Sequence, residues 1–518
     1  MGSSILKPIR VVFAILIGLV LAFVFVDFRQ LIPDKYFDYF LFFQFVPSML
    51  RFIDIESLAA TGFIIVLILT LISGRTYCSF LCPLGIFQDV ISRIGGKFKK
   101  KFRRFGFSKP FTILRYSILA ISVAVFVFGG VYVLTLLDPY SIFGRFMTYF
   151  VKPVIIVVNN LFSDVLIKFD IYTLRREDII GTPLLVYSIP AAFLLLVGLL
   201  SFRKGRIYCN TVCPVGTLLG LISKVSLFRI KFEDSKCTRC GRCAMACKSS
   251  CIDFLNKSID VSRCVDCFNC VKSCPDKALS YGLPERKKEI VEVDNGRRQF
   301  VIGSILSLLG LSPGLVNGQT VPKPTKNSTV KEEKLAPVCP PGATSIKNLN
   351  ERCTACSLCI SACPSDVIHP ATMEYGLMGI MQPRMDYHKG FCAYDCIKCT
   401  EVCPTGALLP LNLEAKKLTQ LGYAIFLIDN CIVNTEKTDC GACSEHCPTK
   451  AVYMVPFEGS LVIPEVNTDI CIGCGACEYS CPVTPFKAIY VDGNPNHMAA
   501  MMPEEEGAVV APQTDFPF

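Results

Sequence analysis

The sequence has few histidines, and none of them falls in its apolar N-terminal part. The four histidines all lie after residue 320, at His369, His388, His446 and His497. The N-terminal part therefore has no imidazole that could hold a b-type haem. The sequence also contains no Cys-x-x-Cys-His, the attachment site of a c-type haem. If the protein carries electrons, we expect no haem among its carriers.

The composition also excludes several broad classes of protein. Thirty cysteines in 518 residues are too many for chance, and a disulfide framework of that density belongs to short secreted domains, so metal ligation is favoured. The net charge of +10 comes from basic residues beside apolar segments, as the positive-inside rule expects, and we predict no nucleic-acid partner. A hydrophobic content of 52% favours a membrane protein.

Four apolar segments predict a membrane module over residues 1–230. They are residues 11–26, 58–72, 118–137 and 184–202. Basic residues between 93 and 109 and after 203 place these two loops and the N-terminus in the cytoplasm. Residues 30–53 are aromatic with scattered charge, which favours a position at the membrane interface. We therefore predict a four-helix transmembrane module that contacts membrane lipid.

Residues 231–290 contain eight cysteines in the bacterial ferredoxin pattern. Three thiolates at Cys-x-x-Cys-x-x-Cys spacing converge on one 4Fe-4S cluster, and the fourth cysteine of the run ligates the neighbouring cluster. Structural zinc is the alternative, but it needs only four cysteines around one ion. The spacing predicts an α+β ferredoxin-like domain with two clusters. Their ligands are Cys237, Cys240, Cys243 and Cys274 for one, and Cys264, Cys267, Cys270 and Cys247 for the other.

Four further motifs lie in residues 338–493 and predict a ferredoxin-type domain with four 4Fe-4S clusters. The motifs are Cys353, Cys356, Cys359, Cys363; Cys392, Cys396, Cys399, Cys403; Cys431, Cys440, Cys443, Cys447; and Cys471, Cys474, Cys477, Cys481. The middle two have irregular spacing, which suggests an insertion within a ferredoxin formed by the outer two. We therefore expect the first motif to pair with the fourth and the second with the third; pairing of neighbours is the alternative. Cys339 is not expected to be a ligand.

An internal repeat places four more cysteines in the membrane module. The sequence Gly-Arg-Thr-Tyr-Cys-Ser-Phe-Leu-Cys-Pro, with Cys78 and Cys82, recurs as Gly-Arg-Ile-Tyr-Cys-Asn-Thr-Val-Cys-Pro, with Cys209 and Cys213. Each copy ends one of two related helical hairpins, and cysteines four apart on a helix share a face. The four thiolates could converge on a seventh cluster. Structural thiols or a redox-active dithiol are the alternatives.

Residues 291–337 separate the two groups of ferredoxin motifs. Arg297 and Arg298 precede a moderately apolar run at 300–316, which favours Tat-type translocation of the folded four-cluster domain to the periplasm on an uncleaved anchor. The run is short for a span, so a peripheral or buried helix is the alternative. Residues 317–337 are predicted to be a linker, and the tail at 494–518 to be flexible or a docking strand.

These motifs together resemble the NapH and NapG ferredoxin-type subunits of periplasmic nitrate respiration, joined into one polypeptide. Residues 1–285 resemble the NapH type, and residues 297–493 resemble the NapG type with its twin-arginine leader. The resemblance implies a multi-pass protein of the bacterial inner membrane, with residues 231–290 cytoplasmic and 338–493 periplasmic. It implies oxidation of quinol from the membrane pool and electron transfer to a periplasmic reductase or cytochrome.

The leading hypothesis is therefore a membrane-bound quinol dehydrogenase with six clusters, or seven if the repeat holds one. Asp138, Tyr140 and Arg145 follow the third predicted span and are candidates for binding a quinone head group, with ordinary interface residues as the alternative. A second hypothesis is an assembly or maturation factor that delivers electrons to a respiratory metalloenzyme. In either case, clusters on opposite faces would be separated by an apolar layer of ~30 Å.

Overall fold

The computed structural model describes residues 5–29, 31–33, 36–55, 61–98, 105–177, 184–233, 235–283 and 330–502. The predicted anchor at 300–316 with its two arginines, the basic residues 99–104, the linker up to residue 329 and the tail from residue 503 lie outside this set.

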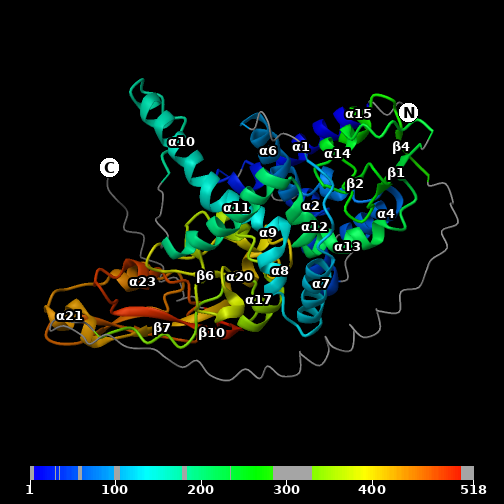
Figure 1. Cartoon of the computed structure of the whole chain (residues 1–518). Coiled ribbons are helices and arrows are strands. Elements are labelled where there is room, and N and C mark those ends of the chain that lie inside the picture. The colour runs from blue at the N-terminus through cyan, green and yellow to red at the C-terminus, as the bar shows by residue number, and fades with distance from the viewer. Residues whose placement is uncertain are drawn as a thin grey trace.

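Three helices among the described residues are long and apolar enough to cross a membrane. They are α1 (Leu6–Val26), α11 (Leu184–Lys204) and a continuous helix over Pro139–Ile167. The last consists of α9 (Pro139–Phe146), a π-helical turn (Met147–Val151) and α10 (Lys152–Ile167), which projects from the body of the molecule (Figure 1). Many large apolar side chains on these helices are exposed, as expected for a lipid-facing surface. The helix at 139–167 was not predicted from the sequence.

The second and third predicted spans form shorter helices than expected. Helix α4 (Gly62–Ser73) has 12 residues and α7 (Thr112–Val127) has 16, so they are about 18 and 24 Å long against the ~30 Å of an apolar bilayer core. Gly129 adopts a left-handed φ of 82° and ends α7, and the chain continues as α8 (Tyr132–Leu137). Both helices are shorter than the predicted spans, so the described residues support three membrane-crossing helices, and the second and third spans stay predictions.

The predicted interfacial stretch at residues 30–53 is divided between buried and exposed side chains. It forms α2 (Phe37–Leu41) and the start of α3 (Phe45–Ile55). Phe37 and Leu41 pack against α1, and Phe45 and Val46 lie in the core that surrounds the repeated cysteines. Phe37 and Phe45 thus pack in the interior of the module, whereas Tyr36, Tyr39 and Phe43 are exposed.

The repeat forms two equivalent helical turns that meet inside the module. The first copy contains α5 (Tyr77–Phe80) followed by α6 (Pro83–Phe98), and the second contains α12 (Ile207–Thr211) followed by α13 (Pro214–Ser223). Gly74 and Gly205 precede α5 and α12 with left-handed φ angles of 78° and 67°. An L side chain is strained at such angles, which explains the glycine in both copies.

The two-cluster domain has the predicted α+β organisation. Strand β1 (Arg229–Phe232) pairs antiparallel with β4 (Leu279–Gly282), and β2 (Ile252–Asp253) pairs with β3 (Ser258–Ile259). Helices α14 (Arg242–Ala246) and α15 (Asn269–Ser273) each carry the third cysteine of one motif and end where the fourth begins.

The four-cluster domain is built from three antiparallel strand pairs and short helices. Its strand pairs are β5 (Ile368–Pro370) with β6 (Pro383–Met385), β7 (Thr419–Phe426) with β10 (Ile489–Ala499), and β8 (Val452–Pro456) with β9 (Val462–Val466). Its helices are α17 (Ile346–Arg352), α18 (Leu358–Ala362), α19 (Lys398–Glu401), α20 (Leu413–Lys417), α21 (Ile432–Thr435), α22 (Ala442–Glu445) and α23 (Ala476–Ser480). The 3₁₀ turns Leu377–Gly379 and Ile428–Asn430 complete it.

The domain begins earlier than the sequence suggests. The backbone N–H groups of Leu335 and Ala336 donate to the Asp492 carboxylate on β10, at 2.8 and 3.0 Å. Asn430 exchanges two hydrogen bonds with the backbone of Val330. Residues 330–337, predicted to be linker, are therefore a strap bound along the four-cluster domain.

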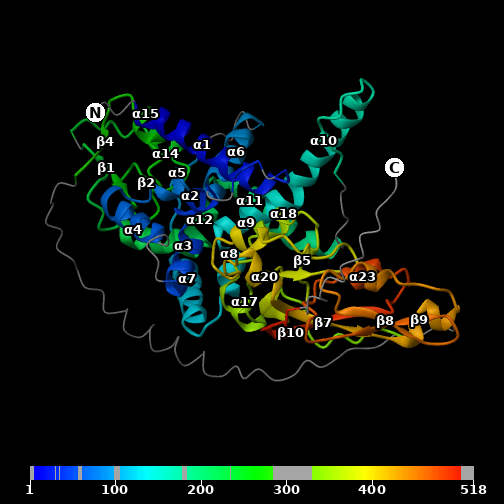
Figure 2. The same ribbon diagram turned by 180° about the vertical axis from the view of Figure 1, so that it is seen from behind.

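The two ferredoxin-type domains contact opposite ends of α1. Near its start, Arg10 pairs with Asp89 of α6, and Asp89 in turn pairs with Lys248 of the two-cluster domain. At its other end, the Ser361 hydroxyl of the four-cluster domain donates to the Phe25 carbonyl at 2.5 Å. Arg10 and Phe25 are 15 residues apart on α1, so these contacts are separated by about 22 Å. Figures 1 and 2 show the two domains on opposite sides of the helical module.

Candidate metal centres and their contact with the membrane module

The structure groups the eight cysteines of the two-cluster domain into two sets of four. Cys237, Cys240, Cys243 and Cys274 line one cavity, which we call site A. Cys264, Cys267, Cys270 and Cys247 form site B, where burial raises the pKa of Cys270 and the three neighbouring thiols raise it further. These are the groupings that the spacing assigns. Cys251 is buried with its sulfur 3.5 Å from that of Cys247, so a fifth thiol lies beside site B.

In the four-cluster domain the structure pairs neighbouring motifs, so the predicted pairing of first with fourth and second with third is wrong. The groupings are site C (Cys353, Cys356, Cys359, Cys403), site D (Cys392, Cys396, Cys399, Cys363), site E (Cys471, Cys474, Cys477, Cys447) and site F (Cys431, Cys440, Cys443, Cys481). The site F cysteines line one cavity. In site C, burial raises the pKa of Cys359, and the thiols of Cys353, Cys356 and Cys403 raise it further.

The irregular spacing that suggested an insertion has a local explanation. After Cys431 the extra residues form α21, which returns the chain so that Cys440 and Cys443 join Cys431 around one cavity. The additional residues are thus absorbed by one short helix, and each pair of adjacent motifs builds its own ferredoxin unit.

Serine substitutions should distinguish the two pairings. Cys481→Ser is expected to remove the same EPR signal as Cys431→Ser, because both cysteines line site F, with a loss of about four iron atoms per chain. Cys339→Ser is the control: Cys339 is buried beside the Tyr375 hydroxyl, 3.4 Å away, and should leave the iron content unchanged. If Cys481→Ser instead removes the signal lost in Cys353→Ser, the structural pairing is incorrect.

The four sites lie in series. The backbone N–H of Cys392 in site D donates to the carbonyl of Cys474 in site E at 2.9 Å. Sites C and D share one ferredoxin unit, and sites E and F share the next. The order is therefore C, D, E, F, with site C next to the membrane module. Site F lies at the far end, where Cys440 and Cys443 are partly exposed.

Site C is packed directly against the module. The Thr135 hydroxyl of α8 donates to the Cys353 carbonyl at 3.2 Å, and the Lys152 ammonium of α10 donates to the Ser361 carbonyl at 2.7 Å. Gly144 of α9 lies so close to site C that a Cβ added there would be 2.4 Å from the Cys356 carbonyl oxygen. The sequence does not predict this contact, because Thr135, Gly144 and Lys152 belong to no recognisable motif.

The four repeated cysteines converge, which is one of the arrangements that the repeat allows. Cys78, Cys82, Cys209 and Cys213 are all buried in one core cluster, which we call the four-thiol centre. The guanidinium of Arg75 lies 3.8 Å from the Cys78 sulfur, and Arg206 donates to the Cys78 carbonyl. Both arginines are fully buried.

This centre suits an anionic metal cluster better than four neutral thiols. The Asp89 carboxylate compensates Arg206 at 2.9 Å. For Arg75, burying a cation is unfavourable unless negative charge compensates it, and four thiolates around an iron–sulfur core would supply it. Within the described part of the chain, Arg75 Nε and Gln88 Nε2 are buried without a hydrogen-bond partner. Gln88 lies 3.5 Å from the Cys209 sulfur. Donors left free beside the thiols fit hydrogen bonding to cluster sulfur.

Asp138, Tyr140 and Arg145, the predicted quinone residues, are 1%, 1% and 2% exposed. Asp138 caps α9 by accepting from the Ser141 N–H at 2.8 Å, and the Arg145 guanidinium donates to the carbonyls of Ser141 and Thr135. The described cavities include none that these three side chains line. They are buried side chains of the helical module, and quinone binding at them stays a prediction.

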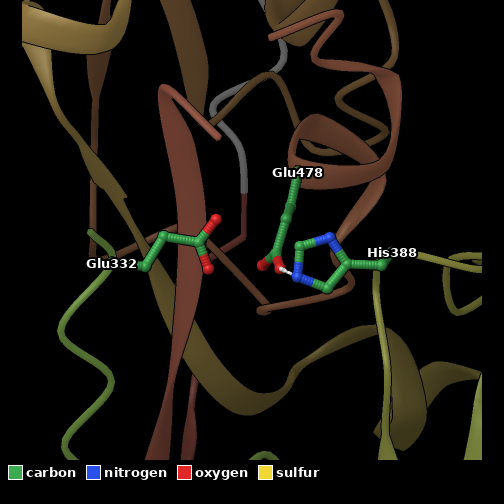
Figure 3. Close-up of side chains that lie close together, drawn as sticks. All are labelled: Glu332, His388 and Glu478. Carbon is green, nitrogen blue, oxygen red and sulfur yellow. Dashed lines mark ion pairs between the residues drawn. The ribbon is translucent and has the colours of Figure 1, made fainter. Parts of the chain in front are cut away.

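Glu332, His388 and Glu478 form the one non-cysteine group of potential metal ligands found among the described residues (Figure 3). Their ligand atoms lie within 4.8 Å of one another. However, the Lys334 ammonium already lies 2.7 Å from Glu478 Oε1 and 3.9 Å from Glu332 Oε2. This group therefore acts as an ion-pair network that holds the strap at 330–337 on the domain.

Comparison with known families supports 4Fe-4S binding along the chain. Residues 58–104 and 185–233, which contain the four-thiol centre, match a family described as a 4Fe-4S binding domain. Residues 438–484 match a 4Fe-4S dicluster domain, which agrees with the pairing of the third and fourth motifs. Residues 349–369 and 234–250 match further 4Fe-4S binding domains.

Curated relatives are ferredoxin-type proteins. The ferredoxin-type protein NapF of Escherichia coli K12 is 26% identical over 152 residues, which cover 29% of this chain and 84% of NapF. The methylamine utilization ferredoxin-type protein MauM of Methylobacillus flagellatus is 33% identical over 149 residues, 27% of this chain and 62% of MauM. No solved structure matches. The chain is thus related to ferredoxin-type electron-transfer proteins, consistent with the resemblance to joined NapH and NapG subunits, and it binds several iron–sulfur clusters.

Proposed function

We propose that this relative of the ferredoxin-type 4Fe-4S proteins is a membrane-bound protein that oxidises quinol and passes the electrons through sites C, D, E and F to an extracytoplasmic reductase or other redox partner. The contact between site C and α9 carries the proposal. Gly144 approaches the Cys356 carbonyl without room for a side chain, so the first cluster of the series is held against the membrane module. 4Fe-4S clusters exchange single electrons at potentials that burial and hydrogen bonding tune.

A cavity beside site C supports entry of quinol from the membrane. Its volume is about 730 Å³, within the range of small-molecule sites. Val125, Phe128 and Tyr132 line its membrane side, and Asn350 and Glu351 of α17 line the opposite side. Phe128 is 90% exposed, which suits contact with lipid. Helix α17 ends one residue before Cys353, so a head group in this cavity would lie close to site C.

The residues of the cavity suit the chemistry of quinol oxidation. A quinol releases two electrons and two protons when it becomes a quinone, and the protons need an acceptor at the site. Glu351 is half-exposed and lies on the cavity wall with its carboxylate 3.9 Å from the Lys347 ammonium. Its carboxylate can take up a proton and release it to water on the side of the four-cluster domain. The apolar residues opposite would hold the ring and the start of its tail.

Filling the cavity should block quinol without disturbing the clusters. Met378 lines the cavity and is 60% exposed, whereas Met373 is 59% exposed and does not line it. We expect Met378→Trp to lower the rate of quinol-driven cluster reduction by about tenfold or more. A tenfold loss corresponds to about 1.4 kcal/mol of quinol-binding free energy. Dithionite reduction of the same clusters should be unchanged. Met373→Trp is the matched control, and equal rates in the two variants would count against the cavity.

The same assay separates the proposal from a maturation factor that delivers electrons without sustained turnover. Quinol added to the purified protein should reduce sites C to F at catalytic rates. Reduction by dithionite but not by quinol would favour the maturation role.

A further inference from the structure

The four-thiol centre touches both ferredoxin-type domains. On one side, Arg75 of the first repeat donates to the Ser262 carbonyl at 2.9 Å, and the backbone N–H of Arg206 of the second repeat donates to the Lys248 carbonyl at 3.0 Å. Lys248 directly follows Cys247 of site B, and Ser262 lies two residues before Cys264 of the same site. Cys267 of site B belongs to the same buried cluster as the four thiols. Site B therefore lies against the four-thiol centre.

On the other side, two hydrogen bonds join the four-thiol centre to site C. Tyr208, which precedes Cys209, donates its hydroxyl to the Leu137 carbonyl at 3.0 Å. Two residues earlier, the Thr135 hydroxyl donates to the carbonyl of Cys353 at 3.2 Å. Tyr208 and Thr135 are both buried. A path of covalent bonds and two hydrogen bonds thus connects a thiol of the centre with a ligand of site C.

We infer that the four-thiol centre holds a redox centre that carries electrons across the membrane module between site B and site C, with Tyr208 and Thr135 positioning the connection. Sites B and C contact opposite ends of α1, and the centre divides the apolar layer between them into two shorter steps. Tunnelling rates fall steeply with distance, so this division determines whether electrons cross at useful rates. The inference goes beyond quinol oxidation and does not depend on it.

Electron balance requires only a one-electron donor at the two-cluster domain. One electron leaves the donor for site A, and one electron arrives at site C, with no bond formed and no proton carried. Cys240 of site A is exposed, with exposed Arg239 and Arg242 beside it. This basic rim fits a small electron carrier with an acidic face. The protein would then receive electrons from a carrier protein on one side of the membrane as well as from quinol.

Transfer across a sealed membrane tests the inference. The full chain is placed in quinone-free liposomes that contain oxidised cytochrome c, and dithionite is added outside. Either orientation of the protein connects the two sides, so the haem inside should be reduced many times faster than in protein-free liposomes. Equal rates in the two preparations overturn the inference. Because quinone is absent, this result is independent of quinol oxidation.

Variants then assign the path. Cys78→Ser with Cys209→Ser should abolish transfer and lower the iron content by one cluster, while the EPR signals of sites A to F remain. Thr135→Val removes the bond to Cys353 and should slow transfer several-fold at full iron content. Thr70→Val is its control, because the buried Thr70 hydroxyl bonds only to Val66 of its own helix. Full transfer in the double cysteine variant, or equal rates in the two threonine variants, contradicts the assigned path.

Discussion

Gly144→Leu should separate the four-cluster domain from the membrane module and abolish most quinol-driven reduction of sites C to F. A Cβ at this position would lie 2.4 Å from the Cys356 carbonyl oxygen and 2.7 Å from the Phe25 ring. Overpacking a tight contact costs about 1–3 kcal/mol or more, enough to shift the docking equilibrium by roughly one to two orders of magnitude. Stopped-flow spectroscopy with quinol as the reductant measures the loss.

The matched control is Gly198→Leu. Gly198 lies in the middle of α11, and nothing lies within 4 Å of a Cβ built there. This variant adds the same side chain to the lipid-facing surface and should react at the wild-type rate. Both variants should keep their full iron content, because neither glycine is a ligand. A Gly144→Leu protein with normal quinol kinetics would show that site C does not receive electrons through this contact.

Asp89→Asn in α6 should strongly weaken the attachment of the two-cluster domain to the membrane module. The Asp89 carboxylate is 12% exposed and pairs with Arg10, with the Arg206 guanidinium at 2.9 Å and with the Lys248 ammonium at 2.9 Å. The amide would leave three cations without their counter-ion. Removing one partner of a buried pair costs about 3–5 kcal/mol. We expect a clear fall in the melting temperature and earlier proteolytic release of the two-cluster domain.

Asp164→Asn provides the comparison for this effect. Asp164 pairs with Arg176 at 3.3 Å, with the two side chains 46% and 66% exposed. Exposed pairs contribute about 0–1 kcal/mol, so this variant should melt within a few degrees of wild type. If the two aspartate variants melt alike, Asp89 does not join the helices to the two-cluster domain.

The ligand groups were predictable where they depend on local spacing, and the pairing of motifs was not. Three cysteines at Cys-x-x-Cys-x-x-Cys spacing wrap one turn wherever they occur, so the sequence alone groups Cys353, Cys356 and Cys359. Whether Cys403 or Cys481 joins them depends on how the chain folds between motifs. The inserted residues after Cys431 were interpreted as a domain insertion, but they form one short helix.

The membrane module differed most from expectation where polar residues interrupt apolar sequence. The helix at 139–167 was not predicted because its sequence is interrupted by Pro153, Asn159 and Asn160. In the structure, the side-chain amide of Asn160 makes two hydrogen bonds with the backbone of Glu177. Residues 30–53 were assigned to the interface from their aromatic content, yet Phe37 and Phe45 pack in the core while Tyr39 and Phe43 are exposed. Contacts such as Thr135 with Cys353 join residues 218 positions apart, and no local pattern encodes them.

The expected ~30 Å gap between clusters on opposite faces is not an unbroken apolar layer in this structure. The four-thiol centre, two buried arginines and two tyrosines occupy the space between site B and site C. The sequence did indicate the four thiols through the repeat. The sequence did not indicate that the Tyr208 hydroxyl donates a hydrogen bond to the Leu137 carbonyl, because a tyrosine before a cysteine predicts no particular partner.

The two ferredoxin-type domains should face opposite sides of the membrane, and electron transfer across the module requires this arrangement. A site for a specific protease can be placed in the exposed turn at Gly459, between β8 and β9, and a second in the turn at Asn256, between β2 and β3. Protease added to spheroplasts should cut the chain at 459 and leave 256 intact, and protease added to inverted vesicles should give the reverse. Cleavage of both turns from the same side would place all the clusters in one compartment and contradict the account.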